Sequence, residues 1–401
     1  MNLNSTNGSA PDLEVPTEPD GSFVLRYFIY AIIVFVSLVG NLSVCYVTYK
    51  ENRMRSFAYV LIGNLAASDV LATLCLPFIL VYLYNGKWTF GTAMCKLLNP
   101  TVTVFAIVTT NTLVAIACDR YRAVVFPFKV RPSTSETRMI IGLIWLMALL
   151  FTLPSYGSRM VTPHGLCIEV FTTEPTLQTS LRRSYSIFMF LVNNLIPLLV
   201  ILGLHTKITL TLKNISLLPQ SFQLTRTSSL AGRDVPSRSS RDSVMLKNAN
   251  AAGAQKRQQM ERKFIRMLLV VVILFVICYM PYQVIFLIVE YKPSVFDNSP
   301  EVMYYLFSYS HLMVWLPCAL NPVIYAALNE RYARSFTRLF CRTFKNLKSF
   351  NAHAEPSYNN VNQTSALTSR RKSSCSLPNG PNRVINGSSR KRGGNNNSSL
   401  V

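Results

Sequence analysis

Charge is scarce in this sequence. Of its 401 residues, 14% are Asp, Glu, Lys or Arg and 50% are hydrophobic, whereas about a quarter of the residues in ordinary soluble domains are charged. The composition therefore excludes one or two soluble domains and favours a membrane protein. The hydrophobic residues are clustered in seven runs that hold no charged side chain except Asp69, namely residues 27–49, 57–84, 97–118, 139–158, 184–206, 267–289 and 302–329.

Each of these runs is long enough to cross a membrane as a helix. About 20 residues, at about 1.5 Å of rise per residue, span a hydrocarbon core of about 30 Å. A buried core helix would account for one such run, but not for seven that are separated by polar loops. We therefore predict an all-α membrane protein, a bundle of seven transmembrane helices with a short amphipathic eighth helix.

Negative charge is scarcer than positive charge, with 18 Asp and Glu against 40 Lys and Arg. Alternate loops place 33 of the 40 basic residues on one face of the membrane. Because basic loops remain in the cytosol, we expect an extracellular N-terminus and a cytosolic C-terminus, in the plasma membrane. The net charge of +22 is then expected to face anionic lipid and cytosolic partners, and not nucleic acid.

Motifs for catalysis are lacking. The chain has four histidines, and they show no zinc-ligand spacing. There is also no glycine-rich phosphate loop and no nucleophile motif. We therefore expect no enzyme activity and no organic cofactor.

Cysteine is rare on the outer side. Of nine cysteines, only Cys95 and Cys167 fall in extracellular loops, where disulfides form and persist. Cys341 and Cys375 face the reducing cytosol, and the remaining five lie within spans. We predict a Cys95–Cys167 disulfide that ties the loop between spans four and five to the start of span three.

The first 23 residues carry acids but no Lys or Arg, unlike a cleavable signal peptide, so the first span is expected to act as the signal. We expect residues 1–23 to be a disordered extracellular segment that precedes a bundle over residues 24–328. Asn4 and Asn7 begin Asn-X-Ser/Thr sequences, and their compartment makes them expected glycosylation sites.

The cytosolic segments differ in composition. Residues 214–257 are rich in Ser, Arg, Asn and Gln without apolar periodicity, which predicts a flexible loop. Residues 329–342 alternate aromatic side chains with arginines and predict an amphipathic helix on lipid, with Cys341 as a palmitoylation site. Residues 343–401 are expected to be disordered, and their last three, Ser399-Leu400-Val401, resemble a ligand of PDZ domains.

A charged cluster, Asp119-Arg120-Tyr121, follows the uncharged run of span three. Glu261, near the cytosolic end of span six, is expected at the same level. An unpaired guanidinium near lipid is unfavourable, so we expect Arg120 to pair with both acids and to hold spans three and six together. A snorkelling arginine explains one basic residue here, but not the cluster and its opposing acid.

Asp69 lies about 12 residues into span two, near the middle of the membrane, where a carboxylate is disfavoured by roughly 2.5–3.5 kcal/mol. Asn41, Thr109 and Asn321 are its expected neighbours. These oxygen atoms would suit sodium or a proton, and the alternative is a structural hydrogen-bond hub.

Together the motifs resemble the rhodopsin-like G protein-coupled receptors over residues 24–341. The resemblance implies that Arg120 receives a heterotrimeric G protein when span six swings outward, and that Asp69 binds sodium. Tyr325 would turn inward on activation, and arrestin and receptor kinases would be further partners. The resemblance is carried by Gly40-Asn41, residues 65–69, Trp88, Cys95, Asp119-Arg120-Tyr121, Trp145, Pro197, Phe275, Pro281 and residues 321–325.

Phe275, Tyr279, Pro281 and Pro197 would form the switch core of such a receptor. The chain departs from the family pattern at two positions. Tyr279 stands where a tryptophan usually precedes Met-Pro, and His205 stands where span five usually carries a tyrosine.

The ligand is constrained by what the outer half of span three lacks. It holds no acid, and Val102 stands where amine receptors carry aspartate, which argues against monoamines; the final span has no lysine for retinal. Glu169 and Glu290 would pair with a peptide arginine. The loops resemble those of receptors for neuropeptide Y, tachykinins and RF-amides. An aromatic cleft is expected from Tyr282, Gln283, Phe286, Phe307, His311 and Trp315.

We therefore expect a receptor for a short amidated neuropeptide, with Arg-Phe-amide ends favoured. Two alternatives remain: a non-peptide ligand on the same fold, or an ion-coupled transporter that uses Asp69. Transporters often contain internal repeats, and none is evident in this sequence.

Overall fold

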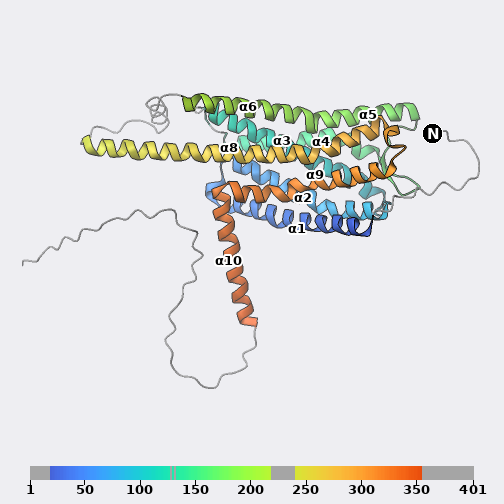
Figure 1. Cartoon of the computed structure of the whole chain (residues 1–401), viewed down its shortest axis with the longest axis horizontal. Helices are drawn as coiled ribbons and strands as arrows, with labels where there is room; N and C mark the ends of the chain where they lie inside the picture. The colour runs from blue at the N-terminus through green and yellow to red at the C-terminus, as the bar shows by residue number, and fades with distance from the viewer. Residues whose placement is uncertain (1–18, 127–128, 131, 218–239, 355–401) are drawn as a thin grey trace, which may run out of the picture. The chain divides into compact units, whose positions relative to one another are not determined.

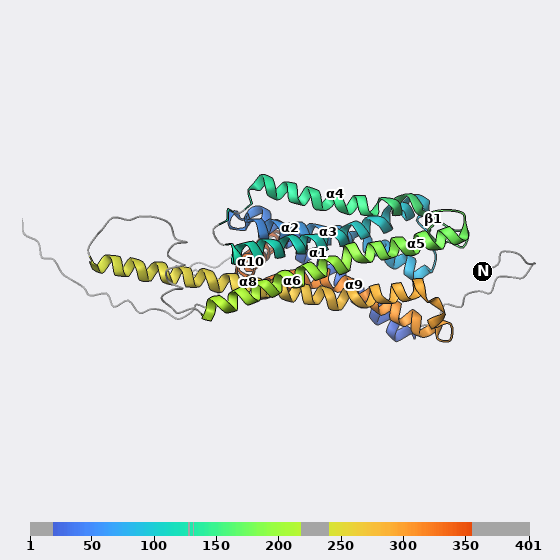
Figure 2. The same ribbon diagram turned by 90° about the horizontal axis from the view of Figure 1, so that it is seen from above.

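The computed structural model describes residues 19–126, 129–130, 132–217 and 240–354, and the side chains of residues 19–126, 129–130, 132–214 and 259–342. Seven helical segments are long and apolar enough to cross a membrane, which confirms the predicted seven-helix bundle (Figures 1 and 2). They are α1 (Asp20–Lys50), α2 (Phe57–Asn85), α3 (Gly91–Val125), α4 (Thr134–Ser158), the combined segment Pro175–Asn214, α8 (Ser240–Tyr291) and α9 (Pro300–Leu328).

The fifth span is not a continuous α-helix. It consists of α5 (Pro175–Phe190), a π-helical turn (Leu191–Leu195) and α6 (Ile196–Leu217). Pro197 lies just after this turn. Because proline has no N–H to donate and its ring clashes with the carbonyl group one turn earlier, the wider π-helical turn accommodates it better than a regular α-helical turn. Figure 1 shows α5 and α6 following one another along the bundle.

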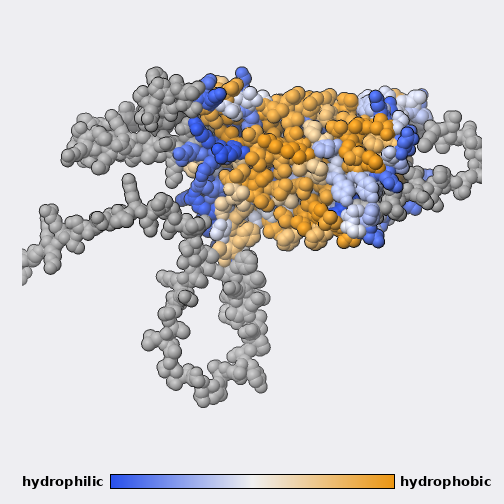
Figure 3. All heavy atoms as spheres, viewed as in Figure 1, coloured by the Kyte–Doolittle hydropathy of each residue, from blue (hydrophilic) through white to orange (hydrophobic). Residues whose placement is uncertain are grey.

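The distribution of hydrophobic and polar side chains is that of a membrane protein. On the face seen in Figure 3, hydrophobic residues cover the middle of the helices and hydrophilic residues gather at their ends. Large hydrophobic side chains such as Phe35, Leu74 and Leu153 are exposed, which is favourable only against lipid. Because most polar groups of the spans cannot face lipid, they turn inward.

α3 lies at the centre of the bundle and packs against α2, α4 and α6. Polar side chains join the helices around it. Trp145 of α4 donates a hydrogen bond to Asn64 Oδ1 (3.0 Å), and Asn64 Nδ2 donates to Thr112 of α3 (2.9 Å). The side chain of Asn64 therefore links α2 to both α3 and α4.

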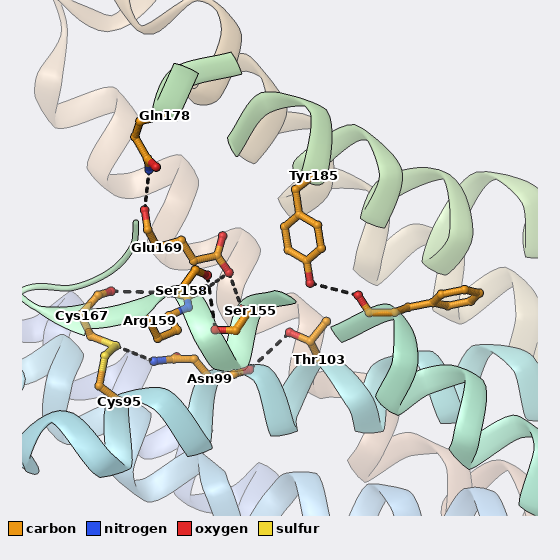
Figure 4. Close-up of polar contacts among 11 residues, drawn as sticks. Cys95, Asn99, Thr103, Ser155, Ser158, Arg159, Cys167, Glu169, Gln178 and Tyr185 are labelled. Atoms are coloured by element: carbon orange, nitrogen blue, oxygen red, sulfur yellow. Dashed lines mark hydrogen bonds and ion pairs between the residues drawn. A yellow bond between two sulfur atoms is a disulfide. The ribbon is translucent and has the colours of Figure 1, made fainter. Parts of the chain in front are cut away.

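A hairpin covers one end of the bundle. It pairs β1 (Arg159–Val161) with β2 (Cys167–Glu169) antiparallel, with Met160 opposite Ile168. The Cys95–Cys167 disulfide joins it to the start of α3, as predicted (Figure 4). We call this the disulfide end of the bundle; Arg120 lies near the other end of α3, which we call the Arg120 end.

Three predicted boundaries differ from the structure. α1 begins at Asp20, within the segment predicted as disordered. The predicted loop over residues 214–257 is shortened from both sides, since α6 ends at Leu217 and α8 begins at Ser240. Residues 245–257 contain Ala, Gln, Lys and Met, whose helix propensity extends α8 without any apolar periodicity.

The predicted amphipathic helix also continues further. α10 spans Glu330–Ala354 and not residues 329–342, because no proline interrupts it before Pro356. In its first turns Tyr332 and Phe336 are buried, whereas Arg331 and Arg334 are exposed. The predictions for Asn4, Asn7 and Ser399-Leu400-Val401 lie outside the described residues.

A close contact between α1 and α9 yields a test of this packing. A Cβ added at Gly40 would clash with the rigid ring of Pro322, because it would lie closer than van der Waals contact allows. A Cβ added at Gly142 of α4 would have no neighbour within 4 Å. We expect Gly40→Ala to lower the stability of the detergent-solubilised protein by about 1–3 kcal/mol through overpacking. Thermal melting of both alanine variants checks this, and equal melting temperatures would contradict the contact.

Candidate functional site

The Arg120 end holds a buried guanidinium with two acidic partners. Arg120 Nε donates to Asp119 Oδ2 (2.9 Å) and Arg120 NH2 pairs with the same carboxylate, while NH1 lies 2.6 Å from Glu261 Oε2. The ring of Phe264 lies 4.6 Å from the guanidinium carbon. Arg120 and Asp119 are buried, but the Glu261 side chain is 42% exposed. The Arg120–Glu261 ion pair thus ties α3 to α8, and water reaches it only from the side of Glu261.

A second ion pair holds the same end of α8. Lys263 Nζ lies 2.6 Å from Glu330 Oε1 at the start of α10, and Arg334 lies 3.1 Å from the other oxygen of Glu330. The hydrogen bond from Lys263, with its charge, holds the pKa of Glu330 below its usual range. The side chains are half exposed, so this pair contributes less than the Arg120 pair.

The aromatic residues of the Arg120 end lie next to these pairs. Tyr325 is buried, and its ring centroid lies 5.7 Å from that of Tyr332. The Tyr332 hydroxyl in turn lies 3.2 Å from Thr48 Oγ1 of α1. Tyr121 instead packs its ring against Phe126 (5.9 Å). The structure therefore places Tyr325 within the contacts that join α1, α9 and α10, and Tyr121 outside them.

Asp69 lies buried between three helices. Asn321 Nδ2 of α9 donates to Asp69 Oδ2 (2.9 Å), and Thr109 Oγ1 of α3 donates to Oδ1 (3.4 Å). The Cys318 thiol lies 3.7 Å from Oδ1. Asn41, an expected neighbour, instead donates to the Cys318 carbonyl oxygen (2.7 Å).

The surroundings of Asp69 fit a small hard cation. The amide oxygens of Asn41 and Asn321 are buried and accept no hydrogen bond from the protein, and such orphaned oxygens suit a cation or water. The thiol of Cys318 does not, because hard cations prefer oxygen ligands. Among the residues whose positions are described, no three His, Cys, Asp or Glu side chains form a metal cluster.

Residues of the expected switch core lie on two segments. Phe275 and Tyr279, one turn apart on α8, stack with ring centroids 4.6 Å apart, and Pro281 follows them. Pro197 follows the π-helical turn, whose Asn193 accepts a hydrogen bond from Thr110 of α3 (3.2 Å). His205 is buried in α6, one face of which packs against α3.

At the disulfide end, both acids expected to await a ligand already have partners. Glu169 Oε1 accepts from Arg159 (2.9 Å) and from the Ser155 hydroxyl, while Gln178 binds its backbone oxygen (2.8 Å) (Figure 4). Glu290 Oε1 lies 2.8 Å from Arg182 Nε. Glu169 therefore stabilises the hairpin, and its ligand role stays a prediction.

Deeper in the bundle the predicted aromatic residues do come together. Tyr282 lies 5.1 Å from Phe307 and 5.8 Å from His311, measured between ring centroids. Trp315 Nε1 donates to His311 Nε2 (3.4 Å), so neutral His311 carries its proton on Nδ1, which faces the Tyr30 hydroxyl at 2.7 Å. We call these five residues the His311 cluster.

The remaining predicted ligand residues surround this cluster less closely. Val102 packs against the buried side chains that include Tyr30 and Trp315. Gln283 and Phe286, on the same helix as Tyr282, are half-buried.

Sequence reasoning missed several partners. Lys263 and Phe264 follow Glu261 by two and three residues. One turn of α8 therefore carries the two acid–base pairs, with Arg120 and with Glu330, and the ring contact with Arg120. Cys318 precedes Asn321 by one turn, at a spacing that faces the same side of a helix. Arg182 offered a weaker signal, because an arginine before a span is usually solvated.

Comparison with known proteins finds several similar receptors. RYamide receptors of Drosophila melanogaster and Tribolium castaneum are 28% identical over 327 residues and 29% identical over 359 residues. The aligned regions cover 80% and 84% of this chain, and 64% and 88% of the two receptors. Neuropeptide FF receptor 2 of Rattus norvegicus is 26% identical over 335 residues, covering 79% of this chain and 72% of that receptor.

The chain thus spans just under two thirds of the Drosophila receptor's length. A family model, 7 transmembrane receptor (rhodopsin family), matches residues 40–325, which is more than half of the chain. These residues include Asp69, Arg120 and Tyr325, around which the buried polar contacts are built. The chain belongs to the rhodopsin family of seven-transmembrane receptors.

Proposed function

We propose that this receptor binds a short C-terminally amidated peptide ending in Arg-Tyr-amide or Arg-Phe-amide, and activates a heterotrimeric G protein. The observation that carries the proposal is the pairing of buried Arg120 with Glu261, which ties α8 to α3 at the end opposite the disulfide. The similar RYamide and neuropeptide FF receptors support the choice of peptide.

The disulfide end faces the outside of the cell in this proposal. The Cys95–Cys167 disulfide supports this orientation, because disulfides persist in oxidising compartments. The distribution of Lys and Arg supports it too, since 33 of the 40 fall on the face of the Arg120 end. The N-terminus is then extracellular, the C-terminus cytosolic, and the receptor lies in the plasma membrane.

Activation is a shift between two arrangements of α8. Peptide at the disulfide end favours the arrangement in which Arg120 and Glu261 part. G protein at the Arg120 end favours the same arrangement by contacting the uncovered guanidinium. Each partner then tightens the binding of the other by a coupling of roughly 1–3 kcal/mol.

The chemistry of the disulfide end suits the proposed peptide. Glu290 offers a buried carboxylate for an arginine side chain, and guanidinium–carboxylate pairs are strong because two parallel hydrogen bonds form. The His311 cluster offers aromatic faces and edges for the terminal Tyr or Phe. The neutral terminal amide avoids the unfavourable burial of a carboxylate beside Glu290.

Sodium at Asp69 is part of the proposal. The Asp69 carboxylate and Thr109 hydroxyl would hold the ion together with the orphaned amide oxygen of Asn321. A bound ion would supply positive charge that links α2, α3 and α9 in the resting arrangement. Arrestin, receptor kinases, a PDZ protein and a palmitoyl group on Cys341 are proposed from sequence alone.

A peptide panel tests the ligand class. In cells expressing the chain with a G protein reporter, we expect responses to peptides ending in Arg-Tyr-amide or Arg-Phe-amide. Their free-acid forms should be weaker by about tenfold or more, because the added charge must lose its hydration on binding. Silence towards every amidated peptide, in cells where surface receptor is verified, would contradict the proposal.

The Arg120 pair is tested by substitutions on either side of it. Without G protein, Arg120→Ala should leave peptide affinity within about threefold, because Arg120 lies at the end opposite the peptide. With G protein present, the same variant should abolish nucleotide exchange and the coupling between the two partners. Glu261→Gln should raise exchange without peptide by about two- to tenfold, as the half-exposed pair is lost. Arg122→Gln, a change at an exposed neighbour, is the control, and normal exchange in Arg120→Ala would remove Arg120 from this role.

The Asp69 site is tested by ion replacement. Replacing choline with sodium at constant ionic strength should weaken agonist binding to the wild type by about three- to tenfold, and Asp69→Asn should abolish the effect. Cys318→Ser, which puts a hard oxygen near Asp69, should enlarge it. A sodium effect that persists in Asp69→Asn, measured by radioligand displacement, would refute the site.

A further inference from the structure

The membrane-crossing part of α8, Gln259–Tyr291, is held by an arginine of another segment near each of its ends. Near the Arg120 end, Glu261 pairs with Arg120 of α3; near the disulfide end, Glu290 pairs with Arg182 of α5. The two acids are separated by about 43 Å of helix at about 1.5 Å per residue. The two ends of this membrane-crossing part therefore carry the same kind of ion pair.

The contact at the disulfide end involves two successive arginines. Arg182 Nε lies 2.8 Å from the Glu290 carboxylate, and Arg183 Nε donates to the Glu290 backbone oxygen (3.2 Å). The Arg183 guanidinium also lies 5.3 Å from the centre of the Tyr291 ring, and the Tyr291 hydroxyl donates to the Arg183 carbonyl oxygen (2.8 Å). We call these four residues the arginine clasp.

The two members of the ion pair differ in exposure. The Glu290 side chain is 8% exposed and that of Arg182 is 45% exposed. A buried carboxylate is unfavourable without a cation, whereas a half-exposed guanidinium can return to water readily. Glu290 therefore requires a guanidinium or another cation, but its present one is replaceable.

The ion pair of Glu169, at the same end of the bundle, has a more buried arginine and more partners than that of Glu290. Its partner Arg159 is 24% exposed, and Ser155 shares the same carboxylate oxygen. Both side chains belong to the hairpin or to the helix turn that leads into it. The Glu290 pair instead joins two separate helices and has a single side-chain partner among the contacts described for its carboxylate.

We propose that Arg182 is an internal stand-in for the arginine of the peptide, which displaces it from Glu290. The proposal rests on the proposed function, because it assigns a regulation to the same peptide site. When the exchange takes place, the peptide guanidinium pairs with Glu290, and Arg182 turns to solvent. The ion pair between α5 and α8 is then lost, while the contacts of Arg183 with the Glu290 backbone and with Tyr291 remain.

The exchange makes the receptor selective for arginine. A neutral side chain cannot replace Arg182, because Glu290 would be left buried without a counter-charge. A lysine replaces it poorly, since its ammonium lacks the planar fork of donors. Arg182 therefore acts as a specificity-determining residue that does not itself need to contact the peptide.

The ligand experiment compares a synthetic peptide ending in Arg-Tyr-amide with the same peptide carrying citrulline, which is isosteric but neutral. Affinity is measured on intact cells, so that only folded surface receptor is counted. Arg182→Gln should raise the affinity of the arginine peptide by about fivefold and leave the citrulline peptide unchanged. Glu290→Gln should bring the two peptides to similar affinity.

Two control variants carry the same charge changes at the disulfide end. Lys292→Gln and Glu301→Gln alter exposed residues and should leave the ratio of the two affinities at the wild-type value. Equal affinities of the arginine peptide for the wild type and Arg182→Gln would overturn the exchange. Weaker binding of both peptides to Arg182→Gln would also overturn it, because that result indicates a purely structural role.

A ligand-free measurement separates this proposal from the proposed function. In the purified receptor, Arg182→Gln and Glu290→Gln should each lower the melting temperature by about 2–4 °C. The double variant should lose about as much as one of them, since both break one pair. Additive losses would overturn the clasp, whereas a wild type that ignores every arginine peptide would refute the proposed function and the exchange together.

Discussion

The low dielectric of a helix bundle is the constraint on which the structure depends, because a charge buried there needs a counter-charge. Arg120 satisfies it with Asp119 on its own helix and Glu261 on α8. The position of α8 is therefore linked to the solvation of one guanidinium. Moving α8 away leaves Arg120 with Asp119 alone, and the site becomes favourable for a partner that brings new acceptors or negative charge.

The two ends of the membrane-crossing part of α8 meet this constraint with the burial of acid and arginine reversed. At the Arg120 end the arginine is buried and the acid half exposed; at the disulfide end the acid is buried and the arginine half exposed. Parting either pair thus uncovers a charge of one sign and returns the other to water. Pro281 lies between the two pairs, and a proline within a helix allows its two halves to tilt differently.

The sequence predicts the spans and the disulfide well, because both follow from local composition and compartment. It predicts the Arg120 pair because Arg120 and Glu261 lie at the ends of spans three and six that share one membrane level. It does not predict that Arg182 meets Glu290 and Arg159 meets Glu169, since rotation of a helix about its axis decides such partners. Loop acids and arginines can pair in several ways, and the hairpin register of β1 and β2 selects one.

Asp69 of α2 joins two further helices of the bundle. Its partners Thr109 and Asn321 belong to α3 and α9, and α9 packs against α8. A cation or proton at Asp69 would remove the need for Asn321 to supply the main donor, so the preferred position of α9 depends on that occupancy. α8 is thus held directly by Arg120 of α3 and Arg182 of α5, and indirectly through its packing against α9. A change at any of these buried charges would bias the same helix, so on the proposed function distant sites would communicate without a single continuous path.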